Sequence, residues 1–242
     1  SEHALARAVD AAERADAQHV CLRPSHRHVS FWGKVCLVAF QLSVQRRVHA
    51  VNRDRPRSFV GAGAFNLVRA DAYRDVGGHE PLRLEVVDDV WLGFLLQRRG
   101  HRTRVFLAPR DFSIDWGATP AALVRVVEKN MFAVLRYRTA IAVAAGGGGL
   151  ALMLLALLGP LWSGSAGWIP FAAHASTGAA GAVLAARQDW PRAAGALAPL
   201  GRLLLPIALL NSTLRTLGRG GVRWRDTFYA LAELRRGQVP MD

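Results

Sequence analysis

The sequence predicts an α/β domain that faces water, followed by transmembrane α-helices. In residues 1–138, short apolar runs of strand length alternate with longer runs of helix length. Residues 139–186 contain no Asp, Glu, Lys or Arg, and a membrane helix needs roughly 20 apolar residues, so this stretch suffices for two spans. The hydrophobic share of 51% excludes a disordered or collagen-like chain.

The first elements are a helix, a strand and a strongly apolar segment. Ser1 is a suitable N-cap for an Ala-rich helix over residues 2–17, and residues 19–22 form a strand. Residues 31–44 are nearly all apolar, which predicts a core helix or, alternatively, a membrane-surface or lipid-acceptor groove. We expect the basic residues 45–58 to form a solvated loop near anionic lipid headgroups.

A Gly-x-Gly turn precedes the next strand and helix. Gly61 and Gly63 lack a Cβ, so their backbone could approach a ligand closely, although a plain loop has the same pattern. Residues 65–68 read as a strand, and a helix starts after Arg69. The pair Gly77-Gly78 ends that helix.

Two adjacent carboxylates open the following helix. Asp88 and Asp89 begin it, Gly100 ends it, and a strand follows at residues 103–107. Its predicted apolar face comprises Val90, Leu92, Phe94, Leu95 and Leu96. Acids at a helix N-terminus can be simple dipole partners, each stabilising by about 0.3–1 kcal/mol, or they can serve chemistry.

The rear of the chain reads as membrane helices and a basic tail. We expect transmembrane helices at about residues 139–162, 166–186 and 194–214, with a first turn near 163–165. Arg202 lies inside the third run, where a central arginine costs about 2.5–3.5 kcal/mol or more, so this run could instead be re-entrant or interfacial. Residues 218–242 read as a basic amphipathic tail that forms a helix on the cytoplasmic membrane surface, or as a disordered tail.

Several motifs occur in an order that resembles one enzyme family. "GAGAFNLVRADAYRDVGGHE", "VVDDVWLGFLLQRRGHRTRVFLAP" and "EKNMFAVLRY" follow one another and precede the apolar helices. This order resembles the rear half of membrane-bound family 2 glycosyltransferases, particularly hopanoid-associated and carotenoid-type lipid glycosyltransferases. The resemblance implies that residues 1–138 are the C-terminal half of a GT-A (Rossmann-like) catalytic domain, the half that holds the acceptor and the general base.

The resemblance also implies roles for the two carboxylates. In this family the second member of an acidic pair is the general base that deprotonates the acceptor hydroxyl, and Asp89 occupies that place. Asp88 stands where the family usually has Glu, and a supporting role is expected. A positioned base contributes typically about 10²–10⁴-fold in an inverting transfer, where the acceptor oxygen attacks opposite the nucleoside diphosphate.

Further residues are implicated in acceptor or donor binding. Gly61 and Gly63 belong to the Gly-x-Gly turn, and His79 and Glu80 match the family's turn after the Gly-Gly pair, where an ordinary surface turn is the alternative.

A second group of implicated residues precedes the membrane. Thr119 and Pro120 begin the helix on which Lys129 and Asn130 lie, and Arg136 could belong to a degenerate Gln-x-x-Arg-Trp element. A cation there could neutralise the leaving diphosphate, or it could anchor the topology of the first span.

The same resemblance implies a missing donor half. The family holds a divalent metal, Mg or Mn, through an Asp-x-Asp that lies before a helix like residues 2–17, and no such motif precedes it here. We therefore expect a C-terminal fragment that is inactive alone. Cys21 and Cys36 have no Cys/His spacing around them that would indicate a metal site or a disulfide framework.

The expected partners are a nucleotide-sugar donor, a lipid or polyisoprenoid acceptor, and the bacterial cytoplasmic (inner) membrane. Ala is abundant and Lys34 and Lys129 are the only lysines, which suggests a high-GC bacterial genome. The net charge of +13 comes from residues scattered among acids and membrane flanks, so no nucleic-acid partner is expected. The alternative is a non-catalytic membrane scaffold or transporter subunit, with His174 and Arg202 as its polar groups inside the spans.

Overall fold

The computed structural model describes residues 3–108, 111–162, 164–224 and 226–241, and it is mixed α/β. The chain forms two compact units. Unit 1 comprises Ser1–Arg27, Val44–Ile114 and Ala232–Asp242, and unit 2 comprises His28–Ser43 and Asp115–Leu231. Residues 1–138, predicted as one domain, therefore contribute to both units.

Unit 1 holds most of the strands. Its helices and strands are α1 (Ala4–Arg14), β1 (His19–Arg23), β2 (Ser25–His26), β3 (Asn66–Val68), α3 (Ala70–Asp75), η1 (Glu80–Leu82), α4 (Asp88–Arg98), β4 (Thr103–Leu107) and β5 (Ser113–Ile114). The helix α2 (Phe31–Val51) runs from unit 2 into unit 1, and α13 (Leu231–Arg236) lies almost wholly in unit 1.

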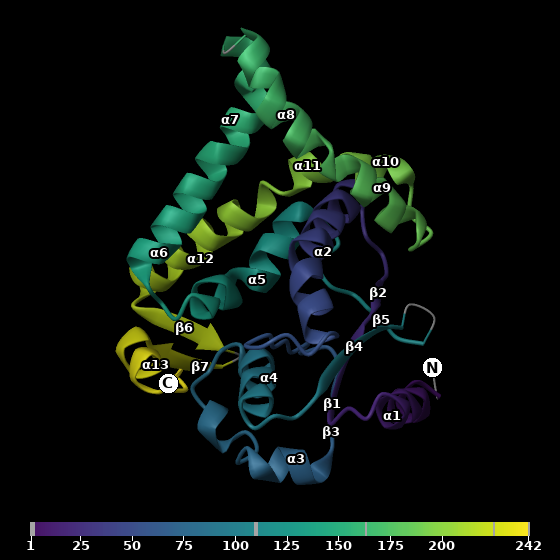
Figure 1. Ribbon diagram of the computed structural model, residues 1–242. Coiled ribbons are helices and arrows are strands. Elements are labelled where there is room, and N and C mark those ends of the chain that lie inside the picture. The colour runs from purple at the N-terminus through teal and green to yellow at the C-terminus, as the bar shows by residue number, and fades with distance from the viewer. Residues whose placement is uncertain (1–2, 109–110, 163, 225, 242) are drawn as a thin grey trace. The chain divides into compact units, whose positions relative to one another are not determined.

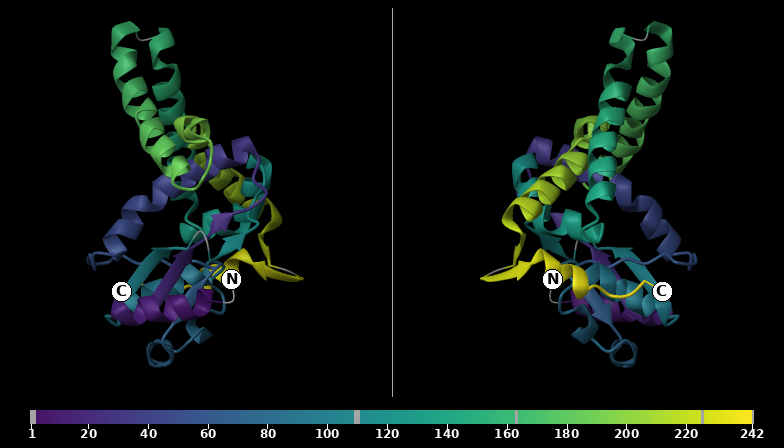
Figure 2. Two further views of the ribbon diagram at one scale, coloured as in Figure 1. Left: turned by 90° about the vertical axis from the view of Figure 1, so that its right-hand side faces the viewer. Right: turned by 90° about the vertical axis from the view of Figure 1, so that its left-hand side faces the viewer.

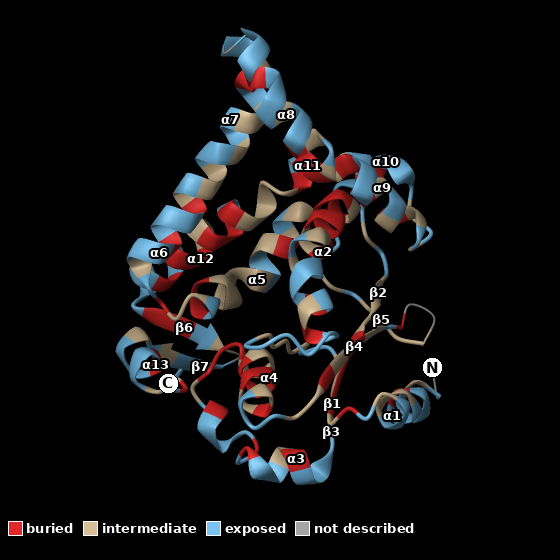
Figure 3. Cartoon of the chain, viewed as in Figure 1, coloured by how far each residue is buried: buried red, intermediate tan, exposed pale blue. Residues whose placement is uncertain are grey.

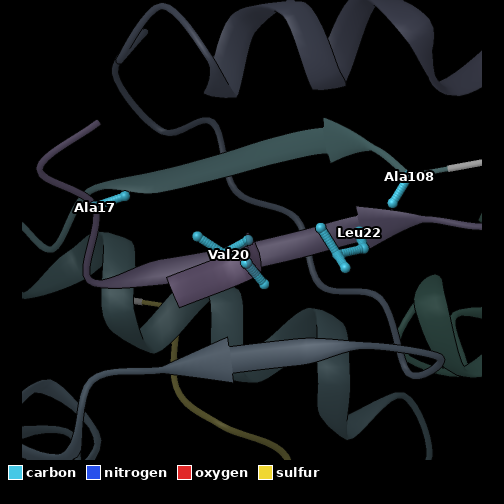
Figure 4. Close-up of a cluster of buried hydrophobic side chains, with 5 residues drawn as sticks. Ala17, Val20, Leu22 and Ala108 are labelled. Carbon is cyan, nitrogen blue, oxygen red and sulfur yellow. The ribbon is translucent and has the colours of Figure 1, made fainter. Parts of the chain in front are cut away.

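A three-stranded sheet forms the centre of unit 1, with β1 between β3 and β4 (Figure 1). Strand β1 is parallel to β4 and antiparallel to β3. Both faces of β1 are covered. Val20 and Leu22 pack with Ala17 and Ala108 (Figure 4), whereas Cys21 packs on the other face against Val48, Val51 and Val105. A strand buried on both faces has a nearly continuous apolar sequence, which explains why the strand at residues 19–22 could be predicted.

Glycines end the elements of unit 1 where the sequence predicted. Gly77, Gly78 and Gly100 have φ of +77°, +61° and +80°, a left-handed conformation that side chains with a Cβ rarely adopt. The predicted first helix is confirmed at Ala4–Arg14, while its proposed cap Ser1 lies outside the described residues. Helix α4 buries Trp91, Leu92, Gly93, Phe94 and Leu96, whereas the predicted Val90 and Leu95 are only half-buried.

The prediction of a loop over residues 45–58 is wrong for its first half. Helix α2 continues to Val51, because Val48 and Val51 add a further apolar stripe that is buried in unit 1. Within unit 2, Val35, Leu37 and Val38 are fully buried, which fits the core-helix alternative for this segment.

Unit 2 is mainly helical. Besides the start of α2, its elements are α5 (Pro120–Val134), α6 (Thr139–Val143), η2 (Ala144–Gly148), α7 (Gly149–Trp162), η3 (Gly164–Gly167), α8 (Trp168–Ala175), α9 (Thr177–Ala186), α10 (Arg192–Ala196), α11 (Ala198–Gly201), α12 (Leu204–Arg219), β6 (Gly221–Trp224) and β7 (Thr227–Ala230). Thr119 caps α5 as predicted, because its side chain accepts a hydrogen bond from the Ala122 N–H at 3.2 Å.

Two helices in the described residues are long and apolar enough to cross a membrane, Thr139–Trp162 and Gly164–Ala186, with hydropathies of 2.3 and 1.3. Both views of Figure 2 show α7 and α8 side by side. The predicted turn falls between them, with Gly164 in the left-handed conformation, while Ser163 lies outside the described residues. Most of α7 is exposed or half-buried (Figure 3), including Leu152 and Leu161. A core helix of a water-soluble protein would bury such side chains.

The third predicted span, residues 194–214, is not a single helix. It is divided among α10, α11 and α12, and Pro199 and Pro206 each lie in the first turn of a new helix. Proline fits the first turn but not the interior of a helix. Gly201 also packs closely on α2, because a Cβ there would lie 2.5 Å from the Val35 carbonyl oxygen.

The predicted amphipathic tail helix is wrong over residues 221–230. These residues form the antiparallel hairpin of β6 and β7, with Val222 opposite Tyr229. The β-branched and aromatic side chains favour strands, and Gly220 ends α12 in the left-handed conformation. Among the described residues after Gly220, α13 is the helical part, and beyond it the Val239 N–H donates to Glu85 in unit 1 at 2.8 Å.

Candidate active site

A cavity of about 530 Å³ opens in unit 1 at the start of α4. It brings together the turn before β3, strand β3 itself, the start of α3, the turn after the Gly-Gly pair, and the first turns of α4. Its lining residues are Gly63, Asn66, Val68, Ala70, Tyr73, His79, Asp88, Asp89 and Leu92. Four residues implicated by the sequence, namely Gly63, His79, Asp88 and Asp89, therefore line one cavity.

Of the two carboxylates that line the cavity, Asp89 is the one held by a backbone hydrogen bond. It is half-buried, and its Oδ2 accepts a hydrogen bond from the Gly63 N–H at 2.6 Å. Burial raises the pKa of Asp89, and the neighbouring Asp88 charge adds to the rise, while backbone N–H donors at Val90 and Gly63 oppose it. A carboxylate with a raised pKa is a stronger base than an exposed aspartate, and it stays ionised at neutral pH unless the rise is large.

Glycine is required where the turn crosses α4. A Cβ on Gly61 would lie 1.8 Å from the Asp89 carbonyl oxygen, and a Cβ on Gly93 would lie 2.0 Å from the Val60 carbonyl oxygen. The two backbones thus touch at both glycines. The Gly61-to-Gly63 turn is held against the first turn of α4, which places the Gly63 N–H on Asp89. Gly61 shapes the site without lining the cavity.

Asp88, His79 and Tyr73 form a more exposed edge of the cavity. The Tyr73 hydroxyl lies 2.6 Å from His79 Nδ1, and His79 Nε2 lies 4.0 Å from Asp88 Oδ2. The Asp88 and His79 side chains are 38% and 51% exposed, so water screens their interaction. This edge can hydrogen-bond a polar ligand.

The remaining implicated residues lie elsewhere. Glu80 lines a second, shallower cavity of about 400 Å³ in unit 1. Lys129, Asn130 and Arg136 belong to unit 2. There the Lys129 ammonium lies 4.6 Å from the centre of the Trp224 ring, and Arg136 has a φ of +55°. The Asn130 side-chain oxygen is buried without a hydrogen-bond partner in the described part of the chain.

Sequence reasoning did not find Asn66 and Tyr73. Asn66 is a half-buried polar residue inside the short strand β3, and this was the available signal, because a polar side chain in a covered sheet needs hydrogen-bond partners. Tyr73 lies six residues before His79 and gives no local signal, because only the left-handed turn at Gly77 and Gly78 brings the two rings together.

No group of three or more His, Cys, Asp or Glu side chains converges as a metal site in residues 3–108, 111–162, 164–224 and 226–241. In unit 2, His174 Nε2 lies 3.0 Å from the Pro199 carbonyl oxygen, and Arg202 lies 3.4 Å from His174 Nδ1. His174 and Arg202, the two polar residues named for the scaffold alternative, are thus in contact with each other.

Comparisons with known proteins find no matching family model, no matching curated protein and no matching solved structure.

The raised pKa of Asp89 predicts an effect on stability. A carboxyl whose pKa is higher in the folded state stabilises the fold below its unfolded pKa, and this contribution is lost as the pH rises through the folded pKa. At pH 7.5 we therefore expect Asp89→Asn to raise the thermal midpoint by a few degrees, and the gain should shrink toward pH 4. Asp10→Asn, an exposed aspartate paired with Arg14 on α1, is the control and should give no gain. A lower midpoint for Asp89→Asn at pH 7.5 would contradict the assigned burial.

Proposed function

We propose that the chain supplies the acceptor half of a membrane-bound, inverting glycosyltransferase of the family 2 type. The observation that carries the proposal is the position of Asp89: it lies at the N-terminus of α4, lines the cavity, and is held by the Gly63 N–H. A fixed, partly desolvated carboxylate beside an open cavity is the arrangement that a general base needs.

The chemistry assigned to Asp89 is a single proton transfer. An acceptor hydroxyl oxygen attacks the anomeric carbon of a nucleotide-sugar, and the bond from that carbon to the diphosphate oxygen breaks. The hydroxyl proton passes to Asp89, and the nucleoside diphosphate leaves with the electron pair of the broken bond. One carboxylate suffices because no covalent glycosyl-enzyme forms in an inverting reaction. The Mg or Mn ion implied by the family resemblance is assigned to none of the described residues.

The proposed acceptor is a lipid or polyisoprenoid alcohol at the cytoplasmic face of a bacterial inner membrane. Two apolar helices of membrane length, with exposed Leu152 and Leu161, support a membrane location. A chain held in a bilayer meets lipid hydroxyls at high local concentration. The cavity volume of about 530 Å³ is in the range of small-molecule sites, so it fits a hydroxyl-bearing headgroup.

Transfer of a labelled sugar tests the proposal. Membranes from cells that express the protein from its complete coding sequence are incubated with ¹⁴C-labelled UDP-glucose, UDP-N-acetylglucosamine or GDP-mannose. We expect radioactivity in the chloroform–methanol extract with at least one donor, and an anomeric configuration opposite to that of the donor. Membranes with an empty vector are the control. Absence of labelled lipid with every donor, with the protein present in the membrane, would favour the scaffold alternative.

A further inference from the structure

A buried polar cluster lies behind the cavity wall in unit 1. His19 and Cys21 are fully buried on β1, and Thr103 on β4 is 5% exposed. Asn66 on the neighbouring strand β3 joins this cluster and also lines the cavity. Buried polar side chains are costly unless they are paired, so their pairing determines how the Asn66 amide is turned.

The backbone fixes the orientation of the Asn66 side chain. The Ala62 N–H donates to Asn66 Oδ1 at 3.2 Å, and a backbone N–H can only donate. The atom facing Ala62 is therefore the amide oxygen and not the nitrogen. The Cys21 Sγ and the His19 Nε2 both lie 3.1 Å from the same oxygen.

Both of these neighbours are able to donate. Burial raises the pKa of the Cys21 thiol to about 12, so the S–H proton is retained at neutral pH. Burial lowers the pKa of His19, which keeps the ring neutral with one N–H. His19 Nε2 faces Asn66 Oδ1, which can only accept, and the Thr103 hydroxyl, 3.1 Å from His19 Nδ1, can donate to Nδ1, so the arrangement places the ring proton on Nε2, facing Asn66.

Three donors thus hold the oxygen of Asn66, and its Nδ2 amide has no hydrogen-bond partner among the described residues. The Nδ2 nitrogen is not one of the fully buried side-chain atoms that lack a partner, so it is accessible to solvent. Asn66 lines the cavity. Because its oxygen is already hydrogen-bonded, the nitrogen is the amide atom that is available to a ligand in the cavity.

We propose that Asn66 binds the acceptor: its Nδ2–H donates a hydrogen bond to the acceptor hydroxyl oxygen whose proton Asp89 takes. This inference rests on the proposed function and names a second residue of the same site. Asn66 and Asp89 are held by consecutive backbone donors, Ala62 N–H and Gly63 N–H, so one turn fixes both side chains. The ligand class is an alcohol, which can donate its proton to Asp89 while its lone pair accepts from Asn66.

The variant Asn66→Asp tests the inference. It keeps an oxygen for the three buried donors and replaces only the amide nitrogen, so the donor to the acceptor is lost. Transfer is measured in mixed micelles with a total lipid extract of the host membranes as the varied acceptor and a fixed labelled donor. We expect the apparent KM for the lipid extract to rise at least about tenfold, because a charged oxygen would then face the acceptor oxygen.

Asn52→Asp is the matched control. Asn52 donates to the Val105 carbonyl at 3.0 Å and accepts from the Val105 N–H at 2.8 Å, so both ends of its amide are used by the backbone. This variant should lower the thermal midpoint and leave the KM unchanged. Asn66→Ser, which lacks the amide but introduces no charge, serves if Asn66→Asp does not fold, and its KM should also rise.

The outcomes separate the two proposals. A KM for both Asn66 variants equal to that of the wild type would overturn the role of Asn66 and leave the transferase function standing. Absence of transfer by the wild type would overturn the proposed function and the role of Asn66 with it. A raised KM with Asn66→Asp and an unchanged KM with Asn52→Asp would support both.

Discussion

Asp89→Asn should lower the rate of sugar transfer by about 10²–10⁴-fold, the usual contribution of a positioned general base. The amide is nearly the same size as the carboxylate, and its oxygen can still accept from the Gly63 N–H at the 2.6 Å position. The turn and the cavity should therefore keep their shape, while the group that accepts the hydroxyl proton is lost. The rate is measured as labelled lipid formed per unit of protein in the same membranes.

Two further variants make this result specific. Asp10→Asn removes an exposed carboxylate from α1 and should leave transfer unchanged. Asp88→Asn removes the neighbouring carboxylate at the cavity edge, which is only 4.0 Å from His79, and should lower transfer less than Asp89→Asn does. If Asp88→Asn abolished transfer and Asp89→Asn did not, the base would have to be reassigned to Asp88.

Gly61→Ala should destabilise unit 1 by roughly 3 kcal/mol or more, at the upper end of the cost of overpacking. The new methyl group would lie 1.8 Å from the carbonyl oxygen and 2.1 Å from the carbonyl carbon of Asp89. These are backbone atoms in the first turn of α4, so no side-chain rotation relieves the clash. In a chain of this size the thermal midpoint should fall by roughly 6–12 °C.

Gly218→Ala is the control for this substitution. Gly218 lies in α12, and a Cβ there would have no atom within 4 Å. Alanine is favoured over glycine in a helix by about 0.8–1 kcal/mol, so this variant should be neutral or slightly more stable. A midpoint for Gly61→Ala equal to that of the wild type would show that the turn does not cross α4 as closely as described.

Much of unit 1 was predictable from the sequence because glycines mark the ends of its helices. The strand at Thr103–Leu107, the helix beginning at Asp88 and the stop at Gly77-Gly78 are confirmed at the predicted positions. In each case the deciding signal was local. It was a segment whose apolar residues repeat at helix or strand spacing, ended by a residue such as glycine that adopts a special backbone conformation.

The errors arose where tertiary packing decided the structure. Residues 45–51 carry arginines that suggested a loop, but Val48 and Val51 are buried against the sheet and extend α2. The hairpin over residues 221–230 has aromatic residues at spacings that also fit a helix. Backbone pairing between β6 and β7 resolved that ambiguity, and pairing cannot be read from either segment alone.

The candidate site was predictable in part. Asp88, Asp89, Gly63 and His79 line one cavity, in line with the motifs that the sequence presented. Asn66 escaped notice because its partners come from His19 and Cys21, which are more than forty residues away in the sequence. The implicated residues Lys129, Asn130 and Arg136 lie in unit 2, and their roles in transfer remain predictions.

The dependence of transfer on pH, measured side by side for the wild type and Asp89→Asn, tests the central claim most directly. As the base that we propose, Asp89 must be ionised, and burial raises its pKa, so the wild-type rate should fall on acidification at a higher pH than the usual aspartate pKa of about 3.9 predicts. Asp89→Asn should show a rate lower by about 10²-fold or more and no such acid limb. Equal rates for the two proteins across the pH range would contradict the assignment of Asp89 as the base.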